Sequence, residues 1–256
     1  MAKNIYFVSD FHLGADALQT SSEREKKIVR WLDEIQNDVK ELYLVGDVFD
    51  HWYEYRKAVP KGYIRLFGKL MEMRDQQIPV YFFTGNHDMW MFRYFEEDFG
   101  IPIYREPIIR EIGGKRFFIG HGDGLGPGDH GYKTIKKIFS NPVCQWAFGW
   151  LHPDVGLKLM RFFSLKSRQY TGEEAPFGAP ESEWLVQFAE QHITTHEIDY
   201  YIFGHRHLPI DYTLSNGHSR YINLGEWMYA SSYGVWDGND VQLRFYDSPY
   251  NTVFGR

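Results

Sequence analysis

The sequence has 256 residues, a net charge of −6 and an isoelectric point near 6.0. Its hydrophobic content of 43% and charged content of 24% are typical of a folded globular protein and exclude a disordered chain. The single cysteine, Cys144, excludes an intramolecular disulfide and any Cys-x-x-Cys site, and it favours a reducing compartment. Since no stretch has the length and hydrophobicity of a signal peptide or a membrane span, we expect a protein that does not cross a membrane.

Strand-like and helix-like stretches alternate over the first 120 residues. Short apolar runs rich in β-branched and aromatic residues predict strands over 5–9, 42–45, 80–84 and 116–119. Between the first three strands, apolar residues at helical spacing predict helices over 21–39 and 61–77. Alternation of this kind favours a mostly parallel sheet with helices on its faces.

The later third of the chain predicts a second group of strands. They cover 200–203, 210–214 and 221–224, and a further pair flanks a turn at 237–240. The dipeptide Asn216-Gly217 lies between two of them and is a strong signal for a β-hairpin. We therefore expect a second, largely antiparallel sheet packed on the first, which together with the helices forms a four-layer α/β/β/α sandwich.

Residues 126–179 fit neither sheet. This segment begins with Gly126-Pro127-Gly128 and ends in a stretch rich in glycine and proline, with helical patterns between. We expect one domain over residues 1–256, with a helical cap inserted at about 126–179 over the site that the strands carry.

Five predicted strands end in residues of the kinds that bind metals. The stretches are Asp10-Phe11-His12, Gly46-Asp47-Val48-Phe49-Asp50, Gly85-Asn86-His87-Asp88, Gly120-His121-Gly122-Asp123 and Gly204-His205-Arg206-His207. In open α/β sheets, ligands bind at the carboxyl ends of the strands. Residues one position apart point to the same side of an extended backbone, so we expect Asp10 and His12 to face one ligand, and likewise His205 and His207. Each glycine allows the chain to turn sharply and come close to what is bound.

This ordered set resembles the calcineurin-like metallophosphoesterase family, whose motifs are D-x-H, G-D-x-x-D, G-N-H-D, G-H and G-H-x-H. All five occur here in order, each at a predicted strand end. The resemblance implies that two divalent metal ions are bound. The implied ligands are Asp10, His12, Asp47 and His207 for the first ion, and Asp47, Asn86, His121 and His205 for the second. Oxygen and imidazole ligands without thiolate suit Mn²⁺, Fe or Zn. We therefore expect one of these metals, and among them we favour Mn²⁺.

Such a centre suits the hydrolysis of phosphate esters. Two metals about 3.5–4 Å apart lower the pKa of a bridging water and neutralise charge on the attacking and leaving oxygens. The resemblance implies that Asp47 bridges the metals and that Asn86 contacts both metal and substrate. We expect His87 to face the substrate, where it either stabilises the transition state or donates a proton to the leaving oxygen. Asp50 and Asp88 are candidates to hydrogen-bond ligand imidazoles.

The cap segment is both basic and apolar. Between residues 132 and 170, seven lysines and arginines accompany one acidic residue, Asp154, although the whole chain carries −6. Many large apolar residues occupy the same stretch. This combination is typical of an interfacial helix on an anionic membrane or of a cap over a lipid phosphate, and it is equally compatible with a small helical subdomain whose basic face is solvated.

Within the superfamily, the sequence is most similar to the UDP-2,3-diacylglucosamine diphosphatases, or hydrolases, of lipid A biosynthesis, from Asp10 to about Trp227. This likeness implies water attack at the α-phosphorus of the substrate pyrophosphate, usually with Mn²⁺, to yield UMP and 2,3-diacylglucosamine 1-phosphate. It also implies a cytoplasmic enzyme at the periphery of the inner membrane. The implied substrate contacts are Asn86, His87, Asp129, Tyr132, Arg161, Ser164, Lys166 and Arg168.

The sequence departs from this subgroup in three motif positions. His87 stands where its best-known members carry arginine, Asp50 where glutamate is frequent, and Arg206 where threonine is common. None of these changes removes an implied metal ligand. They therefore affect which substrate is expected within the superfamily and not the expected catalytic centre.

Three other functions remain open. A general metallophosphoesterase would act on a soluble nucleotide or phosphoester. A non-catalytic scaffold on the same fold would bind a partner protein through its cap, but such scaffolds are expected to lose the ligands that this chain keeps. The net charge of −6 opposes nucleic acid binding, and no obligate protein partner is indicated.

Overall fold

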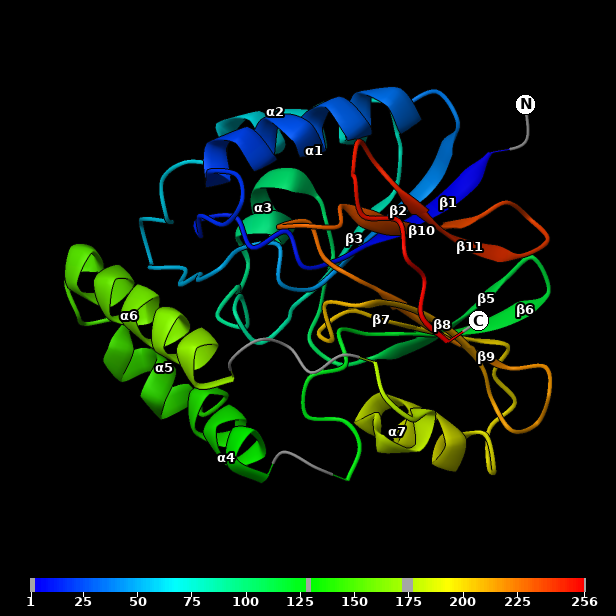
Figure 1. Cartoon of the computed structure of the whole chain (residues 1–256). Helices are drawn as coiled ribbons and strands as arrows, with labels where there is room; N and C mark the ends of the chain where they lie inside the picture. Colours follow the sequence, from blue (N-terminus) through cyan, green and yellow to red (C-terminus); the bar gives the residue numbers. More distant parts are fainter. Residues whose placement is uncertain (1–2, 128–129, 172–176, 256) are drawn as a thin grey trace.

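The computed structural model describes residues 3–127, 130–171 and 177–255. Two β-sheets lie face to face at its centre, and helices cover the outer face of each sheet (Figure 1). This arrangement confirms the four-layer α/β/β/α sandwich that the sequence predicts.

The first sheet has six strands in the order β11-β10-β1-β2-β3-β4. They are β1 (Asn4–Val8), β2 (Val39–Val45), β3 (Val80–Phe83), β4 (Ile103–Tyr104), β10 (Ser232–Trp236) and β11 (Val241–Phe245). Strands β1 to β4 run parallel, as expected, and β10 pairs with β1 antiparallel. The outer face of this first sheet is covered by helices α1 (Ser21–Ile35), α2 (Ile64–Asp75) and α3 (Tyr94–Phe99) (Figure 1).

The second sheet has five strands in the order β5-β6-β7-β9-β8. They are β5 (Ile108–Ile112), β6 (Lys115–Ile119), β7 (Tyr200–Phe203), β8 (Pro209–Thr213) and β9 (Arg220–Leu224). The central strands β6, β7 and β9 run parallel, and only the edge strands β5 and β8 pair antiparallel. The expectation of a largely antiparallel sheet is therefore wrong at its centre. All four residues of β7 are buried, as in a parallel strand that is covered on both faces.

Two strand assignments differ from the sequence prediction. β6 was expected in the first sheet and lies in the second, and the β10–β11 hairpin lies in the first. By pairing with β1, the hairpin satisfies backbone groups that would otherwise form an open edge beside the site. The hairpin predicted at Asn216-Gly217 is confirmed, since β8 and β9 pair antiparallel on either side of it.

Three apolar layers separate the four layers of secondary structure. Trp31 and Phe82 belong to the layer beneath α1 to α3, Phe7 and Phe117 to the layer between the sheets, and Leu185 and Tyr201 to the layer beneath α7 (Trp184–His192). Full burial of a large apolar side chain contributes about 1.5–3 kcal/mol. The sandwich is therefore a rigid frame for the loops at its ends.

Helices α4 (His130–Phe139), α5 (Pro142–Phe148) and α6 (Pro153–Thr171), here called the cap, lie as a group beside the sandwich (Figure 1). A short helix, η1 (Pro180–Ser182), leads from them to α7. The Tyr53 hydroxyl donates a 2.6 Å hydrogen bond to the Gln145 carbonyl, and Trp90 Nε1 donates a 2.7 Å bond to the Phe139 carbonyl. Tyr53 follows β2 and Trp90 follows β3, so these bonds hold the cap against the loops at the ends of the strands. Within the described ranges, no helix is long and apolar enough to cross a membrane.

Candidate metal centre

The loops that carry the five motifs meet at one end of the sandwich. Val8 of β1 lies opposite Leu44 of β2, and Val45 lies opposite Phe83 of β3, so these three strands end level with one another. The loops after β6 and β7 face them from the second sheet. The structure thereby brings together all seven predicted metal ligands, which are Asp10, His12, Asp47, Asn86, His121, His205 and His207.

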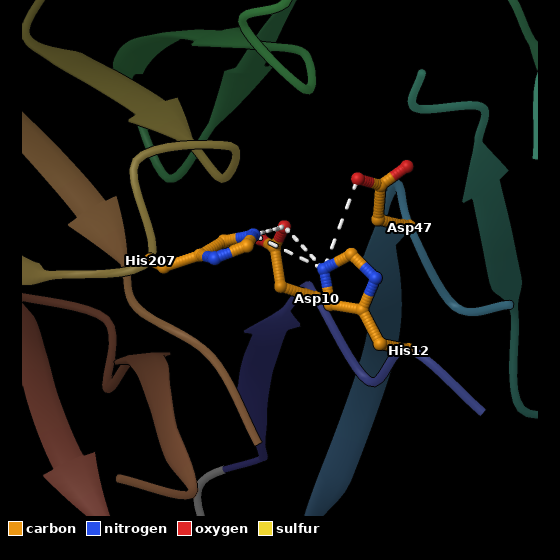
Figure 2. A group of neighbouring side chains, drawn as sticks. All are labelled: Asp10, His12, Asp47 and His207. Atoms are coloured by element: carbon orange, nitrogen blue, oxygen red, sulfur yellow. Dashed lines mark hydrogen bonds and ion pairs between the residues drawn. The ribbon is translucent and has the colours of Figure 1, made fainter. Parts of the chain in front are cut away.

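The first predicted ligand set forms a compact group, in which Asp10, His12 and Asp47 are buried and His207 is half-buried (Figure 2). Nε2 of His12 lies 3.0 Å from Nε2 of His207, and these atoms lie 3.6 and 3.1 Å from Oδ1 of Asp10. Oδ2 of Asp47 lies 3.9 Å from Nε2 of His12. Ligands at right angles around an ion with bonds of about 2.1 Å lie about 3 Å apart, so this spacing fits a shared cation.

The second predicted set lies on the other side of Asp47. Nε2 of His121 lies 3.3 Å from Oδ2 of Asp47 and 3.2 Å from Oδ1 of Asn86. Nδ1 of His205 lies 2.9 Å from the same Asn86 oxygen. Asp47 Oδ2 is thus close to one imidazole of each set, which is the position that a bridging carboxylate requires.

Five of the seven residues have left-handed backbone conformations. The φ angles are 55° at Asp10, 45° at His12, 52° at Asp47, 68° at His205 and 54° at His207. Residues other than glycine adopt this region rarely, at a cost of about 1–3 kcal/mol each, and such strain concentrates at functional sites. The extended backbone expected at Asp10 and His12, and likewise at His205 and His207, is therefore wrong, because tight turns and not strand alternation direct the two side chains of each pair to one place.

The motif glycines provide space for carboxylates from neighbouring loops. A Cβ atom at Gly85 would collide with Asp47 Oδ1, and a Cβ atom at Gly204 would lie 2.5 Å from Asp10 Oδ2. Neither glycine has a left-handed φ. The close approach of other side chains, more than a sharp turn toward a ligand, therefore requires glycine at these two positions.

A carbonyl partner determines the tautomer of His121. Nδ1 of His121 lies 2.9 Å from the Val45 carbonyl oxygen. Because a carbonyl only accepts, Nδ1 donates this bond, and when the ring is neutral its lone pair is on Nε2, the nitrogen that faces Asp47 and Asn86. Metal-binding histidines are commonly oriented in this way.

Opposite charges are concentrated in the centre. Burial alone would raise the pKa of Asp47, but the imidazoles of His121 and His87 outweigh it and lower that pKa well below its usual range. Burial alone would lower the pKa of His121, but Asp47 and Asp10 outweigh it and raise that pKa to about 10. Burial, together with the nearby His121, lowers the pKa of His205 to about 4. At neutral pH, Asp47 is thus ionised and His205 is neutral, and these are the forms that bind metals.

The surroundings of one carboxylate oxygen, Oδ1 of Asp10, favour a bound cation. Oδ1 of Asp10 is buried and, within the described parts of the chain, accepts no hydrogen bond of good geometry, although Nε2 of His207 lies 3.1 Å away and Nε2 of His12 lies 3.6 Å away. A buried carboxylate oxygen without a hydrogen bond is costly unless a cation neutralises it. The oxygen and imidazole donors around it fit a divalent ion such as Mn²⁺, Fe or Zn.

His87 lies beside the centre with one ring nitrogen already engaged. Its backbone N–H donates a 2.8 Å bond to Asp47 Oδ1, and its Nδ1 donates a 2.8 Å bond to the Asp50 carbonyl oxygen. The neutral ring therefore carries a lone pair on Nε2. Since burial lowers the pKa of His87, Nε2 must gain a proton before it can donate one.

Asp50 connects the cap to two imidazoles of the centre. One carboxylate oxygen, Oδ1, lies 3.6 Å from Nδ1 of His12 and 3.7 Å from Nδ1 of His87. The other, Oδ2, accepts a 2.9 Å hydrogen bond from Oγ of Ser164 in α6. Asp50 is therefore placed to orient these rings, as the sequence suggests.

Asp88 contacts the backbone and not an imidazole, so its predicted contact is wrong. Its Oδ1 accepts a 2.7 Å bond from Gly85 N, and its Oδ2 accepts bonds of 2.9 and 3.4 Å from the N–H groups of Val48 and Phe49. Burial, together with the charge of Asp47, raises the pKa of Asp88 to about 7. Asp88 thus joins the loops after β2 and β3.

The structure places only part of the implied substrate contacts. Ser164 is buried against Asp50, whereas Arg161 is exposed on α6. Outside the described residues lie Asp129 and the side chains of Tyr132, Lys166 and Arg168.

Arg24, a fully buried residue of α1, also supports the site, although the sequence motifs do not include it. Its Nε donates a 2.7 Å bond to the Phe11 carbonyl, and its NH2 group donates bonds of 2.7 and 2.5 Å to the carbonyls of His12 and Ala15. Arg24 thereby holds the loop that carries Asp10 and His12. Its burial could have been inferred from its spacing, because Arg24 lies four residues before Ile28 and therefore on the same apolar face of the helix.

Comparison with known proteins agrees with this site. The family model for calcineurin-like phosphoesterases matches residues 3–209, and the chain therefore belongs to this family. Its resemblance to one subgroup is also confirmed. The UDP-2,3-diacylglucosamine hydrolase of Porphyromonas gingivalis (strain ATCC BAA-308 / W83) is 36% identical over 262 residues, covering 95% of this chain and 97% of the relative.

Proteins of the same name from other bacteria are also similar. The relative from Shewanella baltica (strain OS195) is 28% identical over 235 residues, covering 88% of this chain and 90% of its own length. The relative from Serratia proteamaculans (strain 568) is 27% identical over 234 residues, covering 90% and 93%. The likeness thus extends through the cap as well as the sandwich.

Proposed function

We propose that this chain hydrolyses the pyrophosphate bond of UDP-2,3-diacylglucosamine and releases UMP and 2,3-diacylglucosamine 1-phosphate, a step of lipid A biosynthesis. The main support is its 36% identity, over 95% of the chain, to a hydrolase named for this substrate. The convergence of seven metal-binding side chains at one end of the sandwich supports the chemistry.

The proposed centre holds two divalent ions, with Mn²⁺ as the expected metal. Asp10, His12, Asp47 and His207 would bind the first ion, and Asp47, Asn86, His121 and His205 the second. When bound, these ions supply a water of lowered pKa and neutralise charge on the phosphate. Asp47, which lies close to both sets, would fix their separation.

Asn86 and His87 would contact the substrate phosphate from the loop after β3. The Asp50 carbonyl holds the His87 ring through Nδ1, which leaves Nε2 to face the substrate. The negative charge of a bound phosphate favours the protonated imidazole. Nε2 would then donate a hydrogen bond to a phosphate oxygen or a proton to the leaving oxygen.

We further propose that the cap, at about 126–179 within a single domain of 1–256, receives the acyl chains at the cytoplasmic face of the inner membrane. Its exposed apolar residues include Trp146 and Trp150, which are 65% and 76% exposed, and Phe162 and Phe163. Basic residues on the same helices would attract anionic lipid. The proposed substrate contacts in the cap are Asp129, Tyr132, Arg161, Ser164, Lys166 and Arg168.

The first test is release of UMP from UDP-2,3-diacylglucosamine in detergent with Mn²⁺, alongside hydrolysis of bis(4-nitrophenyl) phosphate. Rapid UMP release with little hydrolysis of the simple ester supports the proposal. An Asp47→Asn protein purified in the same way measures contaminating phosphatase. Hydrolysis of the simple ester alone would retain the metal centre and overturn the lipid substrate.

Membrane association has a separate test. The protein should cosediment with vesicles that contain anionic phospholipid, and Trp150→Ser should weaken this binding. Trp184→Ser is the matched control, because Trp184 is 48% exposed on α7 and lies outside the cap. Equal binding by the two variants would remove the cap from the membrane contact.

A further inference from the structure

A cleft with both polar and apolar walls opens between the cap and the sandwich beside the metal centre. Its volume is about 310 Å³, and its walls include Gly85 of the third motif and Arg105, which follows β4. The cap contributes Lys136 from α4 to the opposite wall. A smaller adjoining hollow shares five lining residues with the cleft and is also lined by His121, which belongs to the second predicted ligand set.

We propose that this cleft binds the nucleoside half of the substrate, a uridine 5′-phosphate, and that Arg105 is one of its binding residues. This inference rests on the proposed function, in which UMP is one of the two products. It assigns a place to a part of the substrate for which the sequence motifs provide no residues.

The character of the walls favours a nucleotide over an acyl chain. The charged side chains of Arg105, Glu106, Asp123 and Lys136 all line the cleft. An acyl chain would place apolar surface against these groups, whereas ribose hydroxyls and base edges can hydrogen-bond to them. A volume of about 310 Å³ is at the lower end of the range for small-ligand sites, which suits a single nucleotide.

The position of the cleft also separates the two halves of the substrate. Helix α6 reaches the centre through Ser164 and Asp50, beside His12. The cleft lies beside Gly85 instead, and the smaller hollow that adjoins it lies beside His121. A pyrophosphate lying across the two proposed metal sites would thus direct the acylated sugar toward α6 and the nucleoside into the cleft.

The side chains of the cleft are already oriented for such a ligand. The NH2 group of Arg105 donates bonds of 3.0 and 2.7 Å to the carbonyls of Met91 and Phe92, which holds the guanidinium at the wall. Phe92 also lines the cleft, its half-buried ring packs against Tyr53, and an aromatic ring is a suitable surface for stacking a pyrimidine base. Lys136 is already paired with Asp123 at 2.6 Å, so Arg105 is the cation best placed to meet the ligand.

The test compares two inhibitors of bis(4-nitrophenyl) phosphate hydrolysis by the Mn²⁺-loaded protein. Inorganic phosphate reports on the metal centre alone, and UMP reports on the centre and the cleft together. We expect UMP to inhibit wild type at a concentration at least tenfold lower than phosphate. Arg105→Ala and Phe92→Leu should each reduce this ratio about tenfold, because each removes one contact to the nucleotide. Arg105→Lys should restore part of it, and unfolding midpoints confirm that each variant is folded.

Arg93→Ala is the matched control, since Arg93 is 77% exposed, pairs with Glu97 on the surface and does not line the cleft. Equal inhibition of wild type by UMP and phosphate, or an unchanged ratio in both cleft variants, would overturn the subsite. A reduced ratio without hydrolysis of the lipid substrate by wild type would keep the subsite and overturn the proposed function. Normal lipid hydrolysis by wild type, with an unchanged ratio in both cleft variants, would keep the proposed function and overturn the subsite.

Discussion

Ser164 of the cap donates a 2.9 Å hydrogen bond to Oδ2 of Asp50, a residue 114 positions away in the sequence. The other oxygen of that carboxylate lies 3.6 Å from Nδ1 of His12, a predicted metal ligand. One buried aspartate thus joins the helix expected to receive the lipid to the centre expected to cleave it. A displacement of α6 would therefore move Asp50 and, through it, change the position of the His12 ring at the metal centre.

Replacing Ser164 with alanine removes this connection. The buried Asp50 oxygen loses a hydrogen bond worth about 1–3 kcal/mol, so we expect kcat/KM for the lipid substrate to fall about tenfold or more. Metal content, measured by mass spectrometry, should stay at the wild-type value. Ser182→Ala on η1 is the control, since that hydroxyl bonds only a nearby carbonyl at an exposed position. Wild-type kcat/KM in Ser164→Ala would show that the bond does not serve the reaction.

His87→Ala tests the proposed role of the imidazole that faces the substrate. We expect turnover to fall by about 10²–10⁴, the usual contribution of a positioned acid or base, while both metals stay bound. His218→Ala, in the exposed β8–β9 turn, should behave as wild type. Loss of metal from His87→Ala would instead make His87 a ligand.

His87→Arg separates the two possible roles of this side chain. A guanidinium can stabilise charge on a phosphate, but it does not give up a proton near neutral pH. Recovery of turnover in His87→Arg would therefore assign charge stabilisation. Turnover as low as that of His87→Ala would assign proton donation.

Gly85→Ala should disturb the metal centre although alanine adds only a methyl group. Its Cβ would collide with Asp47 Oδ1, which must move or lose its bond from the His87 backbone. We expect lower metal content and a lower unfolding midpoint. Gly68→Ala in α2 meets nothing within 4 Å and should stabilise the protein by about 0.5–1 kcal/mol. An unchanged metal content in Gly85→Ala would mean that the buried Asp47 side chain can move away from the added methyl group without loss of metal.

Arg24→Met should destabilise the loop that carries Asp10 and His12. Four carbonyls would lose a charged donor, at a cost of about 3 kcal/mol or more in the free energy of unfolding. Arg30→Met, on an exposed position of the same helix, should change it by less than about 0.5 kcal/mol. Similar urea midpoints for the two variants would contradict the positioning role of Arg24.

The placement of the motifs could be predicted because it depends on little beyond strand direction. Asp10, Asp47 and Asn86 each follow a parallel strand, and parallel strands of one sheet end at the same edge. The sheet that each strand joins could not be predicted. An apolar run such as 116–119 has the same pattern in either sheet, and partner choice depends on contacts between distant segments.

Other features of the centre depend on tertiary structure. Aspartate and histidine are more common in the left-handed region than most residues, but this preference is too weak to predict the φ angles of Asp10 and His12, which the surrounding loops impose. The contact between Ser164 and Asp50 depends on how the cap docks, and docking is determined by aromatic residues such as Tyr53 and Trp90. These relationships appear only once the cap and the sandwich are seen together.

Metal uptake should release a proton near neutral pH. In the metal-free protein, the nearby carboxylates raise the pKa of His121 to about 10, so this imidazole is protonated at pH 7. Binding through Nε2 requires the neutral ring, and the metal must therefore displace a proton, whereas His205, with a pKa of about 4, is already neutral. Between pH 5 and pH 9 we expect about one proton released from His121 and an affinity that rises about tenfold per pH unit. Calorimetry with Mn²⁺ in two buffers of different ionisation enthalpy measures this number directly. A His121→Asn variant should release about one proton fewer than wild type, and an affinity independent of pH over this interval would rule out His121 as the group displaced.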